Sequence, residues 1–407
     1  MNSTFLYIDP GTGSMLFSII IGIAATVFFL FRALVIKIKF LLTGSKQKDT
    51  LKNPIVIYNE GKQYCKLFAP ILAEAEKRGL PVLYLTSYEQ DPALSAGWKS
   101  LKAEYIGEGN KAFSRLNFLS ADVVLMTTPG LNVYQLKKSK TVKHYSHIVH
   151  MPTDTTTYRL FGLDYSDSVL LTGEYQKRDI RYLEQARGLP QKELVAVGCT
   201  YLDESLKNIA KYVRDKDNFT VLVSPSWGAS GLLAKFGEKL LDPLVATDWN
   251  IIIRPHPQSK KSEAELLERL TQRYSDRSNV IWDYESDNMI SMSKSNIMIS
   301  DFSGIIFDYT FLFDNPLLYV DTDFDTRPYD MDDVPDKAWQ FETIEKFGIK
   351  ITEPDFANIK EIIQNAADSA ELKAARETAK QQAWCNIGHS AQAVVDFLEG
   401  KITSNGE

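Results

Sequence analysis

Short apolar runs recur along most of the chain, and helical patterns separate many of them. Uninterrupted apolar runs of this length are typical of strands buried on both faces of a parallel sheet. In the first half, strands are predicted at 55–58, 82–85, 121–126, 146–149, 168–171 and 194–197. After a polar helical stretch at 203–218 they are predicted at 220–223, 250–253, 280–282, 296–299 and 317–320. We therefore predict two doubly wound α/β domains, 49–215 and 216–370, followed by closing helices at 371–407.

One long apolar segment precedes these domains. No charged residue lies between Asp9 and Arg32, and an apolar run of roughly 20 residues is long enough to span a bilayer as a helix. The basic residues follow the run instead of preceding it, which is the reverse of a cleaved signal peptide. By the positive-inside rule the residues after the run lie in the cytoplasm. We predict that residues 1–48 form a single-pass anchor in the inner or plasma membrane, with a cytoplasmic catalytic part.

Composition excludes several classes of protein. The net charge is −6 and the pI is near 5.6, which argues against nucleic acid as a partner because phosphate binding leaves a basic footprint. The three cysteines are far apart and show no CxxC spacing, so a disulfide framework or a zinc site is not expected. An acidic run from Asp321 to Asp333 contains six aspartates and is predicted to be a solvated loop. We predict no metal site.

The first motif with chemical character runs from Ser300 to Tyr309 and reads SDFSGIIFDY. It follows a predicted strand and turns directly into a helix predicted at 304–313. The first turn of a helix presents unpaired N–H groups and partial positive charge, which suit phosphate oxygens. Ser300 and Ser303 add hydroxyl groups, and Gly304 would let a ligand approach the backbone closely. The alternative is an ordinary capped helix, with Asp301 or Ser303 as the cap.

The second motif is Arg254-Pro255-His256-Pro257, directly after the strand predicted at 250–253. Each proline fixes its own backbone and extends the residue before it. His256 is therefore expected at the carboxyl edge of the sheet, where open α/β sheets bind ligands. A protonated imidazole or the Arg254 guanidinium would neutralise a diphosphate there. The alternative is a surface turn with a solvated histidine.

The pairing of these two motifs resembles the CDP-glycerol glycerophosphotransferase family, which contains teichoic-acid primases and polymerases. The resemblance extends over roughly residues 140–400, with weaker similarities at Val197–Asp203, Val221–Trp227 and Asn386–Ser390. Two segments depart from the family pattern. Thr200-Tyr201 stands where the family has Pro-Arg, and His150-Met151-Pro152-Thr153 stands where it has His-Gly-Thr-Pro.

The resemblance implies a GT-B-like fold, in which two doubly wound parallel-sheet domains face a cleft, here preceded by the N-terminal transmembrane helix. It also implies transfer of glycerol phosphate, or of a related polyol phosphate, from a CDP-activated donor. The acceptor would be a hydroxyl of a cell-envelope glycan or a lipid-linked molecule, and CMP would leave. CDP-glycerol is then the donor substrate, and no separate cofactor is expected.

On this basis we predict the residues of the site. Arg254, Ser300, Ser303 and Gly304 are assigned to the donor phosphates. His256 would neutralise the leaving phosphate, and His150 would act as the general base, because the pKa of histidine lies near neutrality. The alternative for His150 is a hydrogen-bonded core histidine. Further donor or acceptor contacts are predicted at Asp301, Asp154 and Ser390.

Two rival functions use the same pattern. A GT-B glycosyltransferase that takes a UDP- or CMP-sugar would employ the same helix terminus. A catalytically inactive, membrane-tethered scaffold would keep only the fold. Nucleotide preference separates the first rival from a CDP-dependent transferase, and absence of nucleotide binding would favour the scaffold.

Overall fold

The computed structural model describes residues 21–23, 26–28, 30–31, 34, 53–212, 218–285, 287–367 and 369–403. The chain forms two compact units, Met1–Lys52 and Asn53–Glu407. Most of the predicted spanning segment lies outside the described residues. Those of its residues that are described are helical, with exposed apolar side chains at Ile21, Ile23, Val27, Phe28, Leu30, Phe31 and Leu34. No helix within the described residues is long and apolar enough to cross a membrane.

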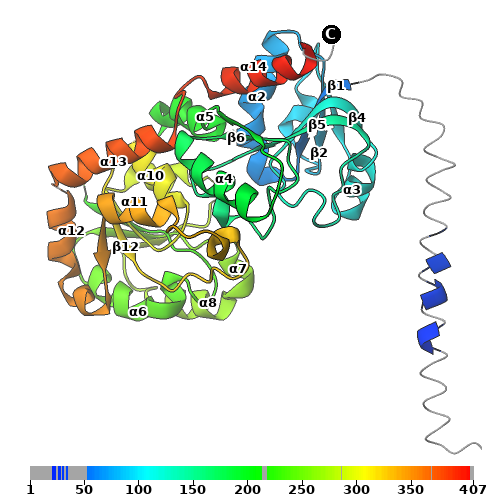
Figure 1. Ribbon diagram of the computed structural model, residues 1–407. Coiled ribbons are helices and arrows are strands. Elements are labelled where there is room, and N and C mark those ends of the chain that lie inside the picture. The colour runs from blue at the N-terminus through cyan, green and yellow to red at the C-terminus, as the bar shows by residue number, and fades with distance from the viewer. Residues whose placement is uncertain are drawn as a thin grey trace, which may run out of the picture. The chain divides into compact units, whose positions relative to one another are not determined.

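The second unit contains two parallel sheets with helices on both faces (Figure 1). The first sheet has seven strands in the order β3-β2-β1-β4-β5-β6-β7. They are β1 (Asn53–Asn59), β2 (Val82–Thr86), β3 (Lys102–Tyr105), β4 (Ser120–Met126), β5 (Thr141–Ile148), β6 (Ser168–Leu171) and β7 (Glu193–Ala196). The helices of this half are α2 (Cys65–Lys77), α3 (Asn110–Leu116), α4 (Lys177–Ala186) and α5 (Thr200–Asn208).

The second sheet has six strands in the order β10-β9-β8-β11-β12-β13. They are β8 (Thr220–Val223), β9 (Asn250–Ile253), β10 (Val280–Trp282), β11 (Ile297–Ser300), β12 (Leu317–Val320) and β13 (Gly348–Ile351). Its helices are α6 (Leu232–Val245), α7 (Ser259–Ser262), α8 (Ala264–Arg273), α9 (Met289–Lys294), α10 (Ile305–Phe313), α11 (Trp339–Phe347), α12 (Ile359–Ala367) and α13 (Ala370–Ala383). The prediction of two parallel α/β sheets is confirmed.

The uninterrupted apolar runs are explained by burial on both faces of each sheet. In β9, Ile251 and Ile253 pack into the core on one face of the second sheet, whereas Ile252 packs into the core on the other. The strand order turns back between β1 and β4 in the first sheet and between β8 and β11 in the second. Ligands bind beside such reversal points, beyond the carboxyl ends of the strands.

The chain crosses between the two halves twice. After β7 it continues through α5 into the second half, and after α13 it returns as α14 (Ser390–Thr403). Figure 1 shows α14, in red, beside the blue α2 of the first half. Val394, Val395 and Leu398 complete the core that also contains Ile55 and Leu67. The first half is therefore built from both ends of the second unit.

The segment between β12 and α11 also connects the halves. Tyr329 forms an isolated antiparallel bridge with Arg159, and the N–H of Asp330 donates to the carbonyl of Tyr158 at 3.2 Å. This segment contains the acidic run that was predicted to be a solvated loop. That prediction is wrong for Asp330, which is 2% exposed.

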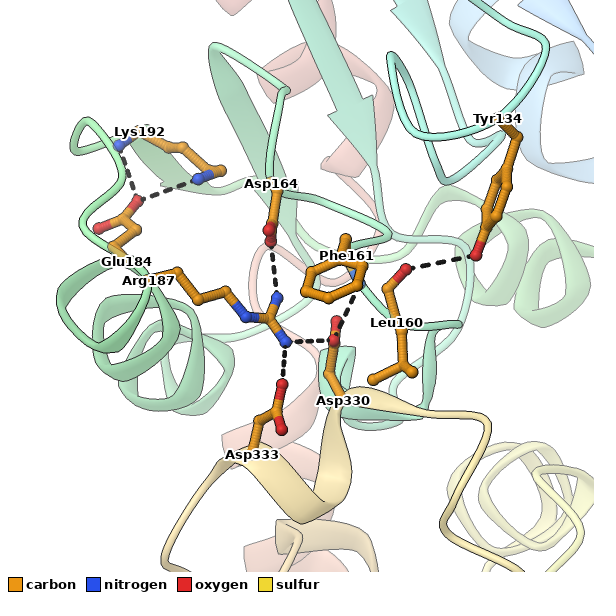
Figure 2. Close-up of polar contacts among 9 residues, drawn as sticks. All are labelled: Tyr134, Leu160, Phe161, Asp164, Glu184, Arg187, Lys192, Asp330 and Asp333. Atoms are coloured by element: carbon orange, nitrogen blue, oxygen red, sulfur yellow. Dashed lines mark hydrogen bonds and ion pairs between the residues drawn. The ribbon is translucent and has the colours of Figure 1, made fainter.

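Arg187, just after α4, holds this segment from the first half (Figure 2). Its guanidinium donates to Asp164 at 2.8 Å and to Asp330 and Asp333 at 2.5 Å each. It also lies 4.7 Å from the centre of the Phe161 ring, and the Phe161 N–H donates to Asp330 at 3.0 Å. We refer to Arg187, Phe161, Asp164, Asp330 and Asp333 as the Arg187 cluster. It ties the second half to the first through charged groups, of which Arg187, Asp164 and Asp330 are largely withdrawn from water and Asp333 is exposed.

Candidate active site in the cleft between the two sheets

A cleft of about 470 Å³ lies where the carboxyl ends of strands from the two sheets face each other. The second half contributes the residues after β8, β9 and β11, and the first half contributes those after β5. Six of the predicted site residues line it: His150, Asp154, Arg254, His256, Ser303 and Gly304. The two motifs and the histidine of the first half thus meet in one place.

The structure defines how His256 is presented. Its Nδ1 accepts a hydrogen bond from the N–H of Gln258 at 3.1 Å, so in the neutral ring the proton is on Nε2. Burial lowers the pKa of His256 below its ordinary value. The imidazole is therefore neutral near pH 7 and offers Nε2–H as a donor, whereas neutralising a phosphate charge would require the protonated ring.

Arg254 lines the cleft, but its guanidinium is held by protein groups. It forms an ion pair with Asp283 and donates to the carbonyl of Glu285 at 2.6 Å. The side chain is 8% exposed. Arg254 thus anchors the loop after β10, which shapes this wall of the cleft, and the contact with donor phosphates stays a prediction.

The residues before α10 divide between the cleft and its support. Ser300 is fully buried, and its hydroxyl donates to the carbonyl of Ser224 at 2.6 Å. Asp301 accepts hydrogen bonds from the N–H groups of Ser226, Leu232 and Ser303. These contacts direct the Ser300 hydroxyl and the Asp301 carboxylate to protein groups, and neither residue lines the cleft. They hold the loop after β8, the start of α6 and the start of α10 together.

Ser303 and Gly304 form the part of the motif that reaches the cleft. Gly304 has ordinary helical φ and ψ, so it is not required for a left-handed backbone. A Cβ built on it would lie 2.7 Å from the Cε of Met151, on the opposite wall. The absence of a side chain thus lets the start of α10 approach the first half closely.

On the first-half wall, His150 belongs to a chain of hydrogen bonds. Its Nδ1 lies 3.2 Å from the hydroxyl of Thr127 and 3.3 Å from the hydroxyl of Tyr158. The Tyr158 hydroxyl is also 3.1 Å from Nε2 of His147. Burial lowers the pKa of His150 to about 4 and that of His147 to about 3. Both rings are neutral at pH 7.

A general base at Nε2 of His150 requires the proton of that neutral ring to be on Nδ1. The contacts are compatible with this tautomer, because the hydroxyl oxygens of Thr127 and Tyr158 can both accept from Nδ1–H. The Tyr158 hydroxyl can then donate to Nε2 of His147. The role of His150 as general base stays a prediction.

The two remaining predicted residues have structural partners. Asp154 is 3% exposed and accepts from the N–H groups of Trp339 and Gln340 at 3.1 and 2.7 Å, which caps α11 of the other half. Burial raises the pKa of Asp154 to about 7. Ser390, the first residue of α14, is fully buried, and its N–H donates to the carboxylate of Asp203. Ser390 is not among the residues that line the cleft.

Tyr158 and Asp308 are among the cleft residues that sequence reasoning did not assign to the site. Tyr158 was overlooked because a tyrosine after a run of threonines has no distinctive pattern. Asp308 lies inside the Ser300–Tyr309 motif. A carboxylate within an otherwise apolar helix is the sequence feature that could have marked it as a site residue. Among the residues that the structure describes, no group of three or more His, Cys, Asp or Glu side chains is arranged to hold a metal ion.

Residues 179–400 match the family model described as CDP-glycerol:poly(glycerophosphate) glycerophosphotransferase. The chain belongs to this family. It is therefore a glycerophosphotransferase-type enzyme, and the scaffold alternative is removed.

Solved structures similar to this glycerophosphotransferase show the same fold. The wall teichoic acid polymerase TagF is 17% identical with a TM-score of 0.57, over 93% of this chain and 98% of that one. A TagF variant soaked with CDPG is 15% identical with a TM-score of 0.53, over 93% and 98%. The UDP-GlcNAc 2-epimerase of Methanocaldococcus jannaschii, in complex with UDP-GlcNAc and UDP, is 14% identical with a TM-score of 0.54, over 85% and 99%. The predicted GT-B-like arrangement is thereby confirmed. A search of curated proteins gave no match.

Proposed function

We propose that the enzyme transfers glycerol phosphate, or a related polyol phosphate, from a CDP-activated donor to a hydroxyl of a cell-envelope glycan or lipid-linked acceptor. The observation that carries the proposal is the meeting of His256, Ser303 and Gly304 with His150 across one cleft. Family membership supplies the reaction class. The TagF neighbour, a wall teichoic acid polymerase with a variant soaked with CDPG, supports the donor and the kind of product.

In the proposed reaction, the acceptor oxygen attacks the phosphorus that carries the glycerol group. A new P–O bond forms, the P–O bond to CMP breaks, and the acceptor proton passes to Nε2 of His150. Phosphoryl transfer needs positioning and charge stabilisation more than a strong base. The weakly basic but neutral imidazole of His150 satisfies that requirement. His256 Nε2–H and the N-terminus of α10 would stabilise negative charge on the diphosphate.

The first test is CMP release by the full-length protein. We expect CMP from CDP-glycerol with a lipid-linked acceptor, and thermal stabilisation by CDP that exceeds stabilisation by UDP. Stronger stabilisation by UDP would instead favour the UDP-sugar glycosyltransferase. No CMP release from any CDP-polyol would reject the proposal.

We also propose that residues 1–48 anchor the enzyme in the membrane, with the catalytic part on the cytoplasmic side. The uncharged stretch between Asp9 and Arg32 and the basic residues after it support this arrangement. The same CMP assay, run on separated membrane and soluble fractions, should find the activity with the membranes. Activity confined to the soluble fraction would rule the anchor out.

A valine at Gly304 is expected to weaken CDP binding by about tenfold or more. A Cβ already meets the terminal methyl of Met151 at 2.7 Å. The methyl groups of valine would displace that side chain and fill space at the proposed diphosphate position, at a cost of roughly 1–3 kcal/mol. Calorimetric titration with CDP measures the effect. Gly400→Val is the control, because a Cβ there meets nothing within 4 Å. Equal CDP affinities for the two variants would contradict the close approach.

A further inference from the structure

Asp308 is a buried carboxyl group that the proposed reaction leaves without a role. It lies in the first turn of α10 and is 4% exposed. It lines the cleft and also a second cavity of about 260 Å³, together with His150 and Met151, which line both. The rest of the second cavity is formed by Gln63, Tyr64, Leu67 and Tyr201. The two spaces therefore adjoin at His150 and Asp308.

The hydrogen bonding of Asp308 is incomplete. Its Oδ2 accepts from the Tyr201 hydroxyl at 3.0 Å. Its Oδ1 is shielded from solvent and has no hydrogen-bond partner among the residues that the structure describes. An unsatisfied buried acceptor costs about 1–3 kcal/mol. Burial raises the pKa of Asp308 to about 7, as expected for a carboxyl group that is poorly compensated.

The chemistry of the second cavity favours hydroxyl groups over phosphate. A carboxyl group repels a phosphate, so the diphosphate belongs at the start of α10 and at His256, on the cleft side. Around Asp308 the cavity offers the phenol groups of Tyr64 and Tyr201 and the amide of Gln63, beside the apolar Leu67 and Met151. This is a small, mixed surface, and the Asp308 carboxyl beside it has one shielded oxygen, Oδ1, without a partner among the described residues. A polyol, which carries both hydroxyl donors and CH groups, matches it.

We propose that Asp308 and the second cavity bind the hydroxyl-bearing end of a polyol and hold it next to His150. The inference rests on the proposed function and deepens it, because it assigns the part of the site that recognises the transferred or accepting group. Two sources share this chemistry: the glycerol of the donor and the terminal polyol of the acceptor. Asp308 is then a specificity-determining residue for the hydroxyl pattern of the substrate.

The test compares wild type with Asp308→Asn in the full-length protein, with CDP-glycerol and a lipid-linked acceptor. We expect the KM for one of the two substrates to rise at least tenfold, while the affinity for CDP, which lacks the polyol, stays within twofold. A rise confined to CDP-glycerol identifies the donor glycerol as the occupant, and a rise confined to the acceptor identifies the acceptor. Unchanged KM values for both substrates, or an equal loss of CDP affinity, would overturn the inference.

A deoxy substrate sharpens the comparison. CDP-propanediol, or an acceptor that lacks one terminal hydroxyl, should be at least tenfold poorer for wild type, because a site built to bind a hydroxyl discriminates against its loss. The penalty should shrink in Asp308→Asn, because an amide oxygen is a weaker acceptor than a carboxylate, and it should vanish in Asp308→Ala, in which the partner of that hydroxyl is gone. Additive losses would show that Asp308 does not contact the hydroxyl. Asp122→Asn, a buried aspartate of β4 outside both cavities, is the matched control.

Further results distinguish failure of this inference from misfolding of the variant and from failure of the proposed function. If Asp308→Asn does not fold, as judged by its thermal transition, Asp308→Glu retains the charge but extends it into the cavity, and it should reproduce the KM rise. If wild type releases CMP and neither variant changes either KM, only this inference falls. If wild type releases no CMP from any CDP-polyol, the proposed function falls and takes this inference with it.

Discussion

Replacing His150 with glutamine is expected to lower kcat for CMP release by about 10²–10⁴-fold, the range for loss of a positioned general base. In the wild type, Nδ1 of His150 contacts the hydroxyls of Thr127 and Tyr158, and a proton on Nδ1 leaves the lone pair of Nε2 available as the base. Glutamine is similar in length but has no basic nitrogen. Affinity for CDP should change less than twofold, because the nucleotide is bound from the other wall. Single-turnover kinetics and CDP titration measure the two quantities.

His144→Gln is the matched control, because His144 is on β5, the strand that precedes His150, and contacts the Ser168 hydroxyl without lining the cleft. The pH dependence gives a second criterion. The pKa of His150 is lowered to about 4, so the basic form is present above roughly pH 5 and is lost only as the pH falls through 4. Asp154 and Asp308 also line the cleft and have pKa values raised to about 7, so the comparison with the variant decides. An inflection near pH 6.5 that His150→Gln abolishes, or a His150→Gln variant with full activity, would contradict this role.

Replacing Arg187 with methionine is expected to lower the free energy of unfolding by about 3–5 kcal/mol, the range for removing one partner of a buried ion pair. Three carboxylates would remain where Arg187 now donates, and Asp330 among them is 2% exposed. Their mutual repulsion would also free the segment between β12 and α11 from the first half. Urea unfolding of the full-length protein measures the loss.

The companion variants isolate the cause. In the double variant Arg187→Met with Asp330→Asn, removal of the unpaired buried charge should restore at least half of the lost stability. Arg273→Met breaks an exposed ion pair with Asp242 and should cost less than about 1 kcal/mol. Similar losses for Arg187→Met and Arg273→Met would show that the Arg187 cluster contributes no more than an ordinary surface pair.

Most of the fold could be predicted because both sheets are covered on both faces. In β8, β9, β11 and β12, the predicted apolar run has alternate residues that pack in different cores. The two strands that were not predicted are β3, with the sequence Lys-Ala-Glu-Tyr, and β13, with the sequence Gly-Ile-Lys-Ile. Both are at the edge of a sheet. Edge strands have one side without a neighbour, so charged residues replace the apolar run on which the prediction depends.

The site was predictable only where a motif residue reaches the cleft with its own functional group. His150, His256 and Ser303 do so, and Gly304 lines the cleft with its backbone. The hydroxyl of Ser300 and the carboxylate of Asp301 instead bond to backbone groups of the loop after β8. A sequence shows which residues follow a strand, but it does not show whether a side chain points to the ligand or supports the loop beneath. The partners of Asp154 and Asp330 were unpredictable for a related reason, since they belong to the other half of the molecule.

Because α14 packs in the first half, that half can finish folding only late in translation. Strand β1 emerges from the ribosome early, yet Val394, Val395 and Leu398, which fill the same core, are synthesised after all of the second sheet. Domains generally fold as units from the N-terminus during synthesis. The first half therefore cannot complete its core until α14 has been synthesised. Until then an apolar surface of α2 stays uncovered, and we expect a chaperone to bind it.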